Sequence, residues 1–238
     1  MAKIFITGSA DGLGQLAAKQ LAKEGHEVIL HARSQQRGEQ AMKAIPGAAA
    51  VLIADLSKPN EVKALAEKAN HYGAFNAVIH NAGIYRSSAE QLLNVNTLAP
   101  YMLTALMQRP ERLVYLSSGM HLSGYGQWTD TPSYSDTKLH MVMLAKVLAR
   151  WWPEVYANAV DPGWVPTKMG GPGAPDDLEK GYQTQVWLAT ANDPAALVSG
   201  GYFHHQRPAR YHRVADDEHL QDSLIQHCEQ YTGIKLAH

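Results

Sequence analysis

Short apolar runs alternate with amphipathic segments along most of this chain. The runs have the length of buried strands, and the segments between them repeat apolar residues every three or four positions, as helices do. This order predicts an α/β fold, namely a Rossmann-type, doubly wound parallel sheet of about seven strands with helices on both faces. The strands are expected at residues 4–6, 28–30, 49–53, 77–79, 113–116, 155–160 and 201–203, and the helices at about 13–24, 35–44, 59–71, 92–107, 134–151 and 176–191.

The length and composition fit one domain. With 238 residues, 45% of them hydrophobic, the chain can bury a sizeable core. No linker, internal repeat or long low-complexity stretch divides it, so residues 1–238 are interpreted as a single domain. The formal net charge of −1 creates no field that would favour nucleic acid or an anionic membrane as a partner.

The chain shows no segment typical of export or of membrane insertion. Met1-Ala2-Lys3 runs directly into the first strand, so no signal peptide is visible. No apolar run approaches the roughly 18 residues that cross a bilayer. Cys228 is the single cysteine and cannot form an internal disulfide, which fits a reducing compartment. We therefore expect a soluble cytoplasmic protein in which Cys228 is a structural or surface thiol.

A glycine-rich turn follows the first strand and opens the first helix. Such a turn lets the backbone approach a diphosphate, and the helix that follows presents free amide donors. Tight turns that merely need a positive φ look the same, so the turn alone is a weak signal. The residues expected to bind a dinucleotide here are Gly8, Ser9, Asp11, Gly12, Leu13 and Gly14.

The end of the second strand predicts which dinucleotide is bound. A carboxylate at this place would hold the ribose 2′-hydroxyl of NAD, but the chain reads His31-Ala32-Arg33-Ser34 and has no acidic residue before Glu39. Arg33 can bind a 2′-phosphate through two hydrogen bonds, with His31 assisting. The alternative is that Arg33 is only a solvated surface residue. NADP(H) is therefore favoured over NAD(H) as cofactor.

Tyr134 and Lys138 form a pair that suits proton transfer. Residues four apart lie on one face of a helix, and an ammonium near a phenol favours the phenolate. One exposed ion pair is too weak to shift the phenol by about three pKa units, so the lysine would need help from a cationic ring in a dry site. A tyrosine and a lysine at this spacing are otherwise common on ordinary helices.

Several of the singled-out residues follow the ends of predicted strands. Gly8, Asp55, Asn81, Ser118 and Pro162 each lie just beyond such an end. Ligands of doubly wound sheets bind beyond the carboxyl ends of the strands. We therefore expect these residues to converge on one site, although Asp55 could instead cap the next helix and either serine of Ser117-Ser118 could simply end its strand.

Taken together, these motifs resemble the classical short-chain dehydrogenase/reductase family, over about residues 3–203. The glycine turn, Asn81-Ala82-Gly83, Asn96, Ser118 and Tyr134-x-x-x-Lys138 match its ordered signatures. His80 replaces an asparagine that the family often has before Asn81. Gly201-Tyr202-Phe203 and the late helix around Leu220 and Leu224 also look similar to the retinol-dehydrogenase-like branch.

The resemblance implies a function and a role for each motif. The family's catalytic set corresponds to Asn96, Ser118, Tyr134 and Lys138, in which the tyrosine moves a proton at a carbonyl or alcohol oxygen. The serine holds that oxygen, the lysine binds the nicotinamide ribose, and the asparagine supports a proton relay. Further cofactor contacts are implied for Asp55, Leu56, Asn81, Ala82, Gly83, Pro162, Gly163, Val165 and Thr167. Ser118 is preferred over Ser117.

The substrate side is expected in the last third of the chain. Residues 164–190 are interpreted as a substrate loop or lid because glycine, proline, tryptophan and methionine are frequent there, and residues 204–238 as a C-terminal cap. An apolar carbonyl or alcohol is the expected substrate. His121 either touches it or is a satisfied loop histidine, and Trp187 is either a core residue or a pocket residue.

The segment 204–213 is rich in histidine and arginine. Adjacent side chains of a strand face opposite ways, so His204 and His205 are poor metal ligands and no metal site is predicted. A solvated segment or subunit contact is preferred, and steering of an anionic substrate by Arg207 or Arg210 stays open. The family often forms homo-oligomers. The main alternative function is a non-catalytic, NADP(H)-sensing regulator on the same fold, and a methyltransferase is disfavoured because its chemistry does not need Tyr134 and Lys138.

Overall fold

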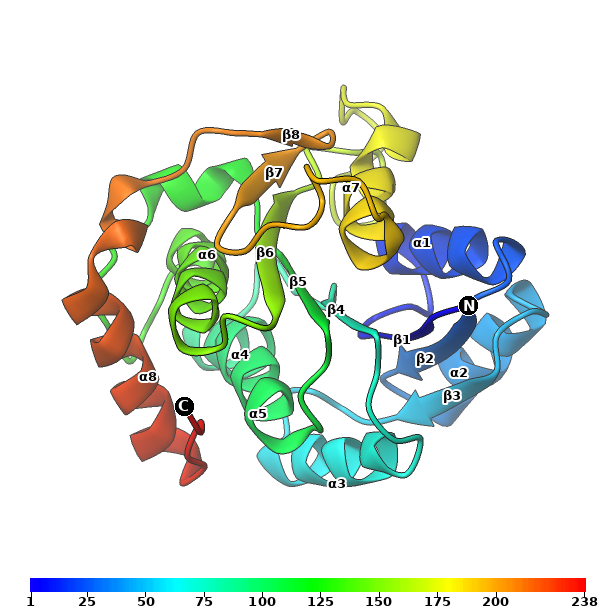
Figure 1. Cartoon of the computed structure of the whole chain (residues 1–238), viewed down its shortest axis with the longest axis horizontal. Coiled ribbons are helices and arrows are strands. Elements are labelled where there is room, and N and C mark those ends of the chain that lie inside the picture. Colours follow the sequence, from blue (N-terminus) through cyan, green and yellow to red (C-terminus); the bar gives the residue numbers. More distant parts are fainter.

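Eight strands form one sheet in the order β3-β2-β1-β4-β5-β6-β7-β8 (Figure 1). The computed structural model describes all 238 residues. The first seven strands run parallel and the last is antiparallel to its neighbour. The strands are β1 Lys3–Ile6, β2 Glu27–Ala32, β3 Ala50–Ile53, β4 Ala77–His80, β5 Arg112–Leu116, β6 Tyr156–Asp161, β7 Tyr202–His204 and β8 Arg207–Pro208. The predicted doubly wound parallel sheet is confirmed, with β8 as an additional antiparallel edge strand.

Helices cover both faces of the sheet. They are α1 Gly12–Lys23, α2 Gln35–Ala44, α3 Pro59–Asn70, α4 Ala89–Leu93, η1 Asn94–Leu98, α5 Ala99–Leu106, η2 Gly119–Ser123, α6 Tyr134–Trp151, α7 Leu178–Thr190, η3 Arg213–Asp216 and α8 Glu218–Thr232. One core lies between the sheet and α1, α2 and α7, and a second, larger core lies between the sheet and α3, α5, α6 and α8. The central strands are buried on both faces, which explains why they read as continuous apolar runs rather than alternating ones.

The predicted helix at 92–107 is the element that differs most from expectation. It starts earlier, because the Ser88 hydroxyl accepts a hydrogen bond from the Gln91 amide and caps α4. The π-helix η1 then separates α4 from α5, and Pro100 lies in the first turn of α5. Apolar spacing does not reveal such a local widening of the helix, which is often found at functional sites. Asn96 lies within it.

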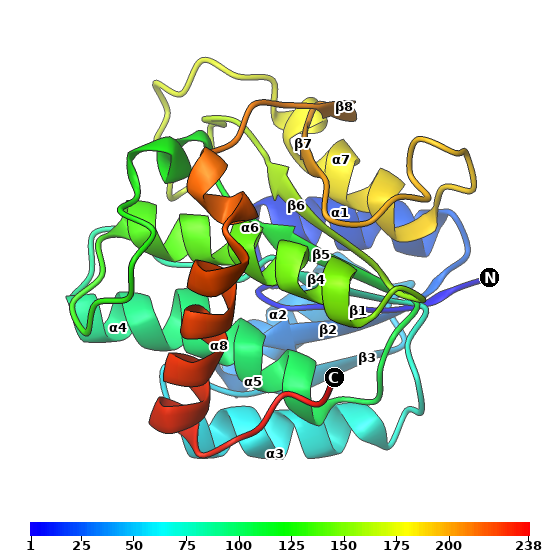
Figure 2. The same ribbon diagram turned by 60° about the vertical axis from the view of Figure 1, so that its left-hand side comes forward.

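The C-terminal segment packs onto the body of the sheet domain. Figure 2 shows α8 lying across α6, where Leu224 and Ile225 join the larger core. Beyond α8, the chain is fastened by hydrogen bonds from the Tyr101 hydroxyl to the Ile234 carbonyl (2.7 Å) and from Trp152 Nε1 to the Ala237 carbonyl (2.9 Å). Residues 218–238 thus lie over α6 and α5, whereas His204, Arg207 and Pro208 belong to the edge of the sheet.

The single thiol belongs to this packing. Cys228 is fully buried on α8, and burial raises the pKa of its thiol. A thiolate is the reactive form of cysteine, so the side chain acts as a small apolar core residue rather than as a nucleophile. None of the helices combines the length and the apolar character needed to cross a lipid bilayer.

Candidate active site

The turn between β1 and α1 can form only because it has glycine at the positions where a Cβ would be strained or would collide. Gly8 and Gly12 have φ values of +64° and +58°, in the left-handed region. A Cβ on Gly8 would lie 2.9 Å from the Cα of Ala82, and one on Gly14 would lie 2.6 Å from the Gly8 carbonyl oxygen. The turn is therefore pressed against the residues that follow β4, and its backbone is open on the other side.

Side chains from neighbouring strands hold this turn in place. Asn81 Nδ2 donates to the carbonyl oxygens of Thr7 (3.0 Å) and Gly8 (3.1 Å), and the Ala82 amide donates to Thr7 Oγ1 (3.0 Å). Ser9, which was predicted to bind the cofactor, is buried and donates its hydroxyl hydrogen to the Ile6 carbonyl instead. Ser9 and Asn81 thus fix the shape of the turn.

His31 has a different position from the one expected. Its Nδ1 accepts a hydrogen bond from the Gly8 amide (2.9 Å), so the Nε2 hydrogen points to the Ala54 carbonyl (3.0 Å). The ring is buried, and burial lowers the pKa of His31 to about 4. The expectation that His31 assists in binding a phosphate is wrong, because both ring nitrogens are occupied and the ring stays neutral.

A cavity of about 550 Å³ lies above the turn. Most residues predicted to bind the cofactor line it, namely Gly8, Asp11, Gly12, Leu13, Arg33, Asp55, Leu56, Asn81, Ala82, Gly83, Tyr134, Lys138, Pro162 and Thr167. Ser9, Gly14, Asn96, Ser118, Gly163 and Val165 are not among the lining residues. The lining also contains Arg37, Ile84, Ser87, Gln91, Ser117, Lys168 and Met169, which sequence reasoning did not assign to a cofactor site.

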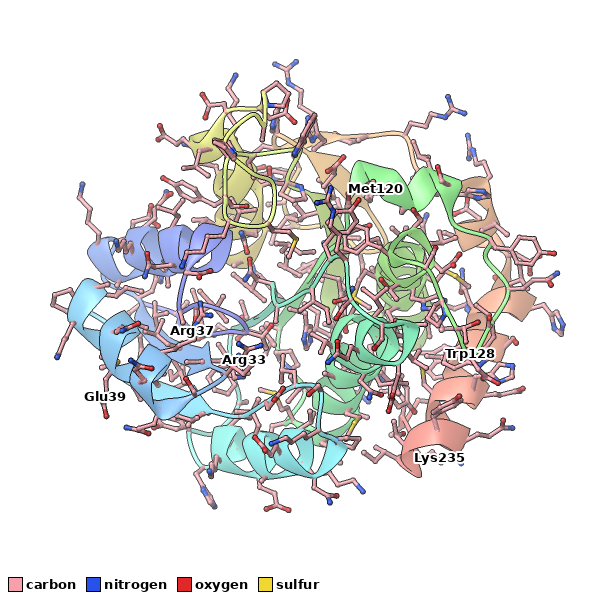
Figure 3. The ribbon with its side chains drawn as sticks, turned by 180° about the vertical axis from the view of Figure 1, so that it is seen from behind. Arg33, Arg37, Glu39, Met120, Trp128 and Lys235 are labelled. Carbon is pink, nitrogen blue, oxygen red and sulfur yellow. The ribbon has the colours of Figure 1, made fainter.

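Three cations surround one end of this cavity. Arg33, after β2, and Arg37, on α2, lie next to each other, whereas Glu39 lies at the outer side of the helix (Figure 3). Arg37 and Lys168 both form ion pairs with Asp11, the latter at 3.0 Å. Arg37 lies in the first turn of α2, only four residues after Arg33, and this closeness along the chain was the signal that could have identified the second arginine.

Asp55 makes local contacts at the same end. Its Oδ1 accepts hydrogen bonds from the Ser57 amide (3.0 Å) and hydroxyl (2.8 Å), which together with Lys58 lower the pKa of the Asp55 carboxyl. The residue at the N-cap of α3 is Lys58, so the alternative that Asp55 caps this helix does not hold. The second carboxylate oxygen of Asp55, at the cavity wall, can still accept a hydrogen bond from a ligand.

Tyr134 lies at the start of α6, where Ser133 and Asp136 form a capping box. The pKa of Tyr134 is raised to about 12, chiefly by burial and to a smaller extent by the Asp161 carboxylate, while a hydrogen bond with the Ser118 side chain acts in the opposite direction. The Tyr85 ring lies edge-on to it, with centroids 4.8 Å apart. The phenol is therefore protonated at neutral pH.

Lys138 lies one turn further along α6 and is buried. Its Nζ donates to the Leu116 carbonyl (2.8 Å) and is 5.5 Å from the centroid of the Tyr134 ring. Burial lowers the pKa of Lys138 to about 8. The expected lowering of the Tyr134 pKa by this lysine is not found in the protein alone, because burial dominates at the phenol and the ammonium is directed to a backbone carbonyl.

The two serines after β5 have distinct partners. The Ser117 hydroxyl donates to the Lys138 carbonyl (2.7 Å) and is buried, so it joins β5 to α6. The Ser118 hydroxyl accepts from the Met120 amide (3.2 Å) and contacts the Tyr134 hydroxyl. Ser118 is therefore the serine that lies at the phenol, although Ser117 lines the cavity.

Asn96 lies in the π-helix η1 and has no direct contact with the cavity. Its amide group bonds both backbone groups of Ile84, at 2.8 and 3.0 Å, and donates to Thr137 Oγ1 (3.1 Å). A Cβ on Gly83 would lie 3.1 Å from Lys138 Nζ and 3.5 Å from Asn96 Oδ1. Asn96 and Lys138 thus both lie against Gly83, so Asn96 is positioned behind the lysine.

Exposed apolar side chains gather on the loops after β4, β5 and β6. This set, which we call the apolar mouth, comprises Tyr85, Met120, Leu122, Tyr125, Trp164 and Met169. Trp164 is 59% exposed, and its Nε1 donates to the Gly170 carbonyl (2.8 Å), which orients the ring. Trp187 instead packs edge-on against Phe203, as expected of a core residue.

The histidines beyond β5 have partners in the backbone or in one another. His121 is fully buried, with Nδ1 at 2.7 Å from the Ser118 carbonyl and Nε2 accepting from the His212 amide, so it is a satisfied loop histidine. The rings of His204 and His205 stack on one another. The structure contains no group of three or more His, Cys, Asp or Glu side chains arranged to hold a metal ion.

Comparison with known proteins agrees with this geometry. A family model described as short chain dehydrogenase matches residues 2–177. The chain is 45% identical to an oxidoreductase of Emericella nidulans over 98% of both chains, and 25% identical to retinol dehydrogenase 13 of Mus musculus over 99% of this chain and 85% of the relative. Its fold is similar to that of a blue fluorescent protein from a metagenomic library in complex with NADPH, with a TM-score of 0.71, 21% identity, and coverage of 85% of this chain and 95% of the other.

Proposed function

We propose that this chain, which belongs to the short-chain dehydrogenase/reductase family, is an NADP(H)-dependent oxidoreductase that interconverts a carbonyl and an alcohol. The observation that carries the proposal is that Tyr134 and Lys138 line the same cavity as the glycine turn. A proton donor and a diphosphate cradle are thereby brought to one edge of the sheet, where doubly wound folds bind their ligands.

The cavity fits a dinucleotide. Gly8 and Gly12 adopt backbone conformations that glycine favours, and the first turn of α1 presents amide donors to a diphosphate. Asp55 and Leu56 would hold the adenine end, and Asn81, Ala82, Gly83, Pro162 and Thr167 the nicotinamide end. Gly163 and Val165 would shape the loop behind that end. When bound, the nicotinamide supplies or accepts the hydride.

The basic end of the cavity favours NADP(H). Arg33 and Arg37 are placed to bind a 2′-phosphate with charge-assisted hydrogen bonds, and no carboxylate follows β2 to hold a 2′-hydroxyl. The NADPH complex of the similarly folded fluorescent protein agrees with this preference. NAD(H) is expected to bind more weakly.

Tyr134 is proposed to act as the general acid and base. Its hydroxyl donates a proton to the carbonyl oxygen during reduction and accepts one from an alcohol during oxidation. Ser118, in contact with the phenol, would hold the same oxygen. Lys138 would bind the nicotinamide ribose, and Asn96, behind it at Gly83, would support the resupply of protons from solvent.

The apolar mouth favours a bulky apolar carbonyl or alcohol. Exposed tryptophan, tyrosine and methionine side chains offer a large contact area at small entropic cost. Met169 lines the cavity itself, so the loop part of 164–190, which precedes α7 at Leu178, can close on a substrate from the side of β6. We propose that this loop is a lid and that no metal takes part in the reaction.

The proposal is tested by measuring NADPH oxidation with a panel of aromatic and aliphatic aldehydes and ketones. We expect turnover by the wild-type protein, a loss of about 10²- to 10⁴-fold in Tyr134→Phe, and unchanged NADPH binding in that variant. The variant Tyr231→Phe, on exposed α8, is the matched control. Cofactor binding without turnover of any probe would favour the regulator, and full activity of Tyr134→Phe would contradict the assigned role.

A further inference from the structure

The carboxylate of Asp11 is directed away from the helix that it precedes. Asp11 is the N-cap residue of α1, a position at which a side-chain oxygen ordinarily accepts a hydrogen bond from a helix amide. Its side chain makes no such bond. The amides of the first turn therefore stay free of the carboxylate and open to a diphosphate, and the charge of Asp11 is available for other partners.

One oxygen of this carboxylate is shared by two cations. Asp11 Oδ2 pairs with Arg37 Nη2 and, at 3.0 Å, with Lys168 Nζ. Both cations line the cavity, and Arg37 lies next to Arg33 (Figure 3). A guanidinium and an ammonium that converge on one oxygen are also suited to bind a phosphate. Asp11 therefore occupies, within the protein, a place that a phosphate oxygen could take.

The two cations come from segments that are far apart in the chain. Arg37 belongs to the first turn of α2. Lys168 belongs to the loop after β6, in a turn that the Gly171 amide closes by donating to the Thr167 carbonyl (2.8 Å). A Cβ on Gly12 would lie 4.0 Å from Thr167 Cγ2, so this loop lies against the glycine turn. Asp11 thus connects α2 and the loop at the basic end of the cavity.

These ion pairs can exchange for a stronger anion. The side chains of Asp11 and Arg37 are 37% and 38% exposed and that of Lys168 is 85% exposed, and ion pairs at such exposure contribute little to stability. A phosphate monoester carries about two negative charges and three strong acceptor oxygens, against one charge on a carboxylate. Arg37 and Lys168 should therefore prefer a phosphate to Asp11, but their pairs with Asp11 have to break first.

We propose that Asp11 competes with the 2′-phosphate of NADP(H) for Arg37 and Lys168, and thereby reduces the preference of the site for NADP(H) over NAD(H). This inference rests on the proposed function. To bind the 2′-phosphate, Arg37 and Lys168 have to leave Asp11, whose own charge then opposes the phosphate. NAD(H) has no phosphate at this end, so the ion pairs of Asp11 can persist while it is bound. Lys168 is thereby a third cation of the 2′-phosphate site, beside Arg33 and Arg37.

Ligand binding measures this competition without any turnover. NADPH and NADH are titrated into the wild-type protein and Asp11→Asn by calorimetry, and 2′,5′-ADP and 5′-AMP isolate the part of the site that binds the 2′-phosphate. Asparagine is also a favoured N-cap residue, so the variant removes the charge and keeps the start of α1. We expect Asp11→Asn to bind NADPH and 2′,5′-ADP about 5- to 10-fold more tightly, and NADH and 5′-AMP within about twofold of wild type, because two exposed ion pairs no longer compete.

A double-mutant cycle shows whether Asp11 withholds Lys168 from the phosphate. In the wild-type background, Lys168→Met should weaken NADPH binding by only about twofold, because the ammonium is held by Asp11. In the Asp11→Asn background the same substitution should weaken it by about fivefold, because the released ammonium then binds the 2′-phosphate. Equal effects of Lys168→Met in the two backgrounds would overturn the competition for Lys168.

Glu67→Gln is the matched control, because it removes an exposed charge on α3 outside the cavity and should change neither affinity. Unchanged or weaker NADPH binding by Asp11→Asn would overturn the proposal, since the ion pairs would then hold the loop over the cofactor rather than compete with it. If the wild-type protein binds neither NADPH nor 2′,5′-ADP, the proposed function falls together with this inference. Binding of NADPH without turnover of any carbonyl would remove only the proposed catalysis.

Discussion

The floor of the cavity and its mouth are built in opposite ways. At the floor, Gly8, Gly14 and Asn81 are packed so closely that the turn has no room for a Cβ on either glycine, and His31 uses both ring nitrogens to hold it. At the mouth, Trp164 and the other apolar side chains are exposed. The floor therefore suits one constant ligand, and the mouth suits selection among substrates.

This difference indicates where substitutions should affect the cofactor and where they should affect the substrate. A tightly packed turn resists any added atom, because the neighbouring backbone must move. An exposed apolar side chain contributes contact area and is replaced at small cost to the fold. Cofactor affinity and substrate affinity should thus respond to separate sets of residues.

The largest effect is expected from Gly14→Ala. The added methyl would collide with the Gly8 carbonyl and with the Asn81 amide, so the turn must open. Overpacking of this kind costs about 1–3 kcal/mol, and we expect NADPH affinity to fall by up to about 100-fold. Fluorescence titration with NADPH measures the loss. Gly173→Ala, in the loop at the mouth with nothing near its Cβ, is the matched control, and equal losses in the two variants would refute the contrast between floor and mouth.

Arg33→Ala should have the next largest effect. A charge-assisted hydrogen bond contributes about 1.5–3 kcal/mol, so NADPH affinity should fall by about 10- to 100-fold while NADH affinity stays nearly constant. Arg207→Ala, at the exposed edge strand β8, serves as control. Binding of both cofactors is measured by titration. Equal weakening of NADPH and NADH would show that Arg33 does not read the 2′-phosphate.

Lowering the pH should reduce the stability of the fold, because His31 and His80 are buried as neutral imidazoles. Burial lowers the pKa of His31 to about 4 and that of His80 to about 3, against an ordinary value of 6.5. The unfolded state binds a proton at these histidines at a higher pH than the folded state does. The stability that the neutral histidines contribute is therefore complete above pH 6.5 and is lost as the pH falls from 6.5 toward 4. The loss at pH 5 should be about 2 kcal/mol for each histidine.

Denaturant unfolding at pH 7 and pH 5 measures this loss. His80→Asn replaces an imidazole whose Nδ1 has no partner with a side chain that does not titrate, so the stability of the variant should depend less on pH. An unchanged pH dependence in His80→Asn would show that His80 takes up no proton preferentially on unfolding. His212→Asn, with a less buried ring, is the control.

The smallest effect is expected from Trp164→Ala. Loss of this exposed ring should raise KM for a bulky aromatic carbonyl by about 3- to 10-fold, through lost contact area, and leave NADPH binding unchanged. Steady-state kinetics with 2-naphthaldehyde and with propanal compare a large and a small substrate. A change in cofactor affinity would place Trp164 in the floor rather than in the mouth, and an equal change in KM for both aldehydes would contradict selection by size.

Much of the floor was predictable because few sequences satisfy its constraints. The turn needs glycine at Gly8 and Gly12, and strand ends bring Asp55, Asn81 and Pro162 to one edge of the sheet whatever the details of packing. The alternation of strands and helices fixed this topology from local patterns alone. The parallel direction of the first seven strands and the start of α6 at Tyr134 agree with the sequence-based expectation.

The remaining features depend on contacts between distant segments. Nothing near His31 indicates that its ring joins the Gly8 amide to the Ala54 carbonyl. The rise of the Tyr134 pKa comes from burial and from Asp161, a residue far along the chain. The π-helix around Asn96 and the short strand β8 have no periodicity that sequence analysis can detect.

The edge strand β8 has a consequence for how copies of this protein can meet. It consists of Arg207 and Pro208 only, and both residues are exposed. Proline has no amide hydrogen to offer, and a charged arginine beside it discourages a hydrophobic neighbour. This edge of the sheet therefore disfavours pairing with a strand of another molecule. Self-association on that side is expected to use side-chain contacts rather than a continued ladder of backbone hydrogen bonds.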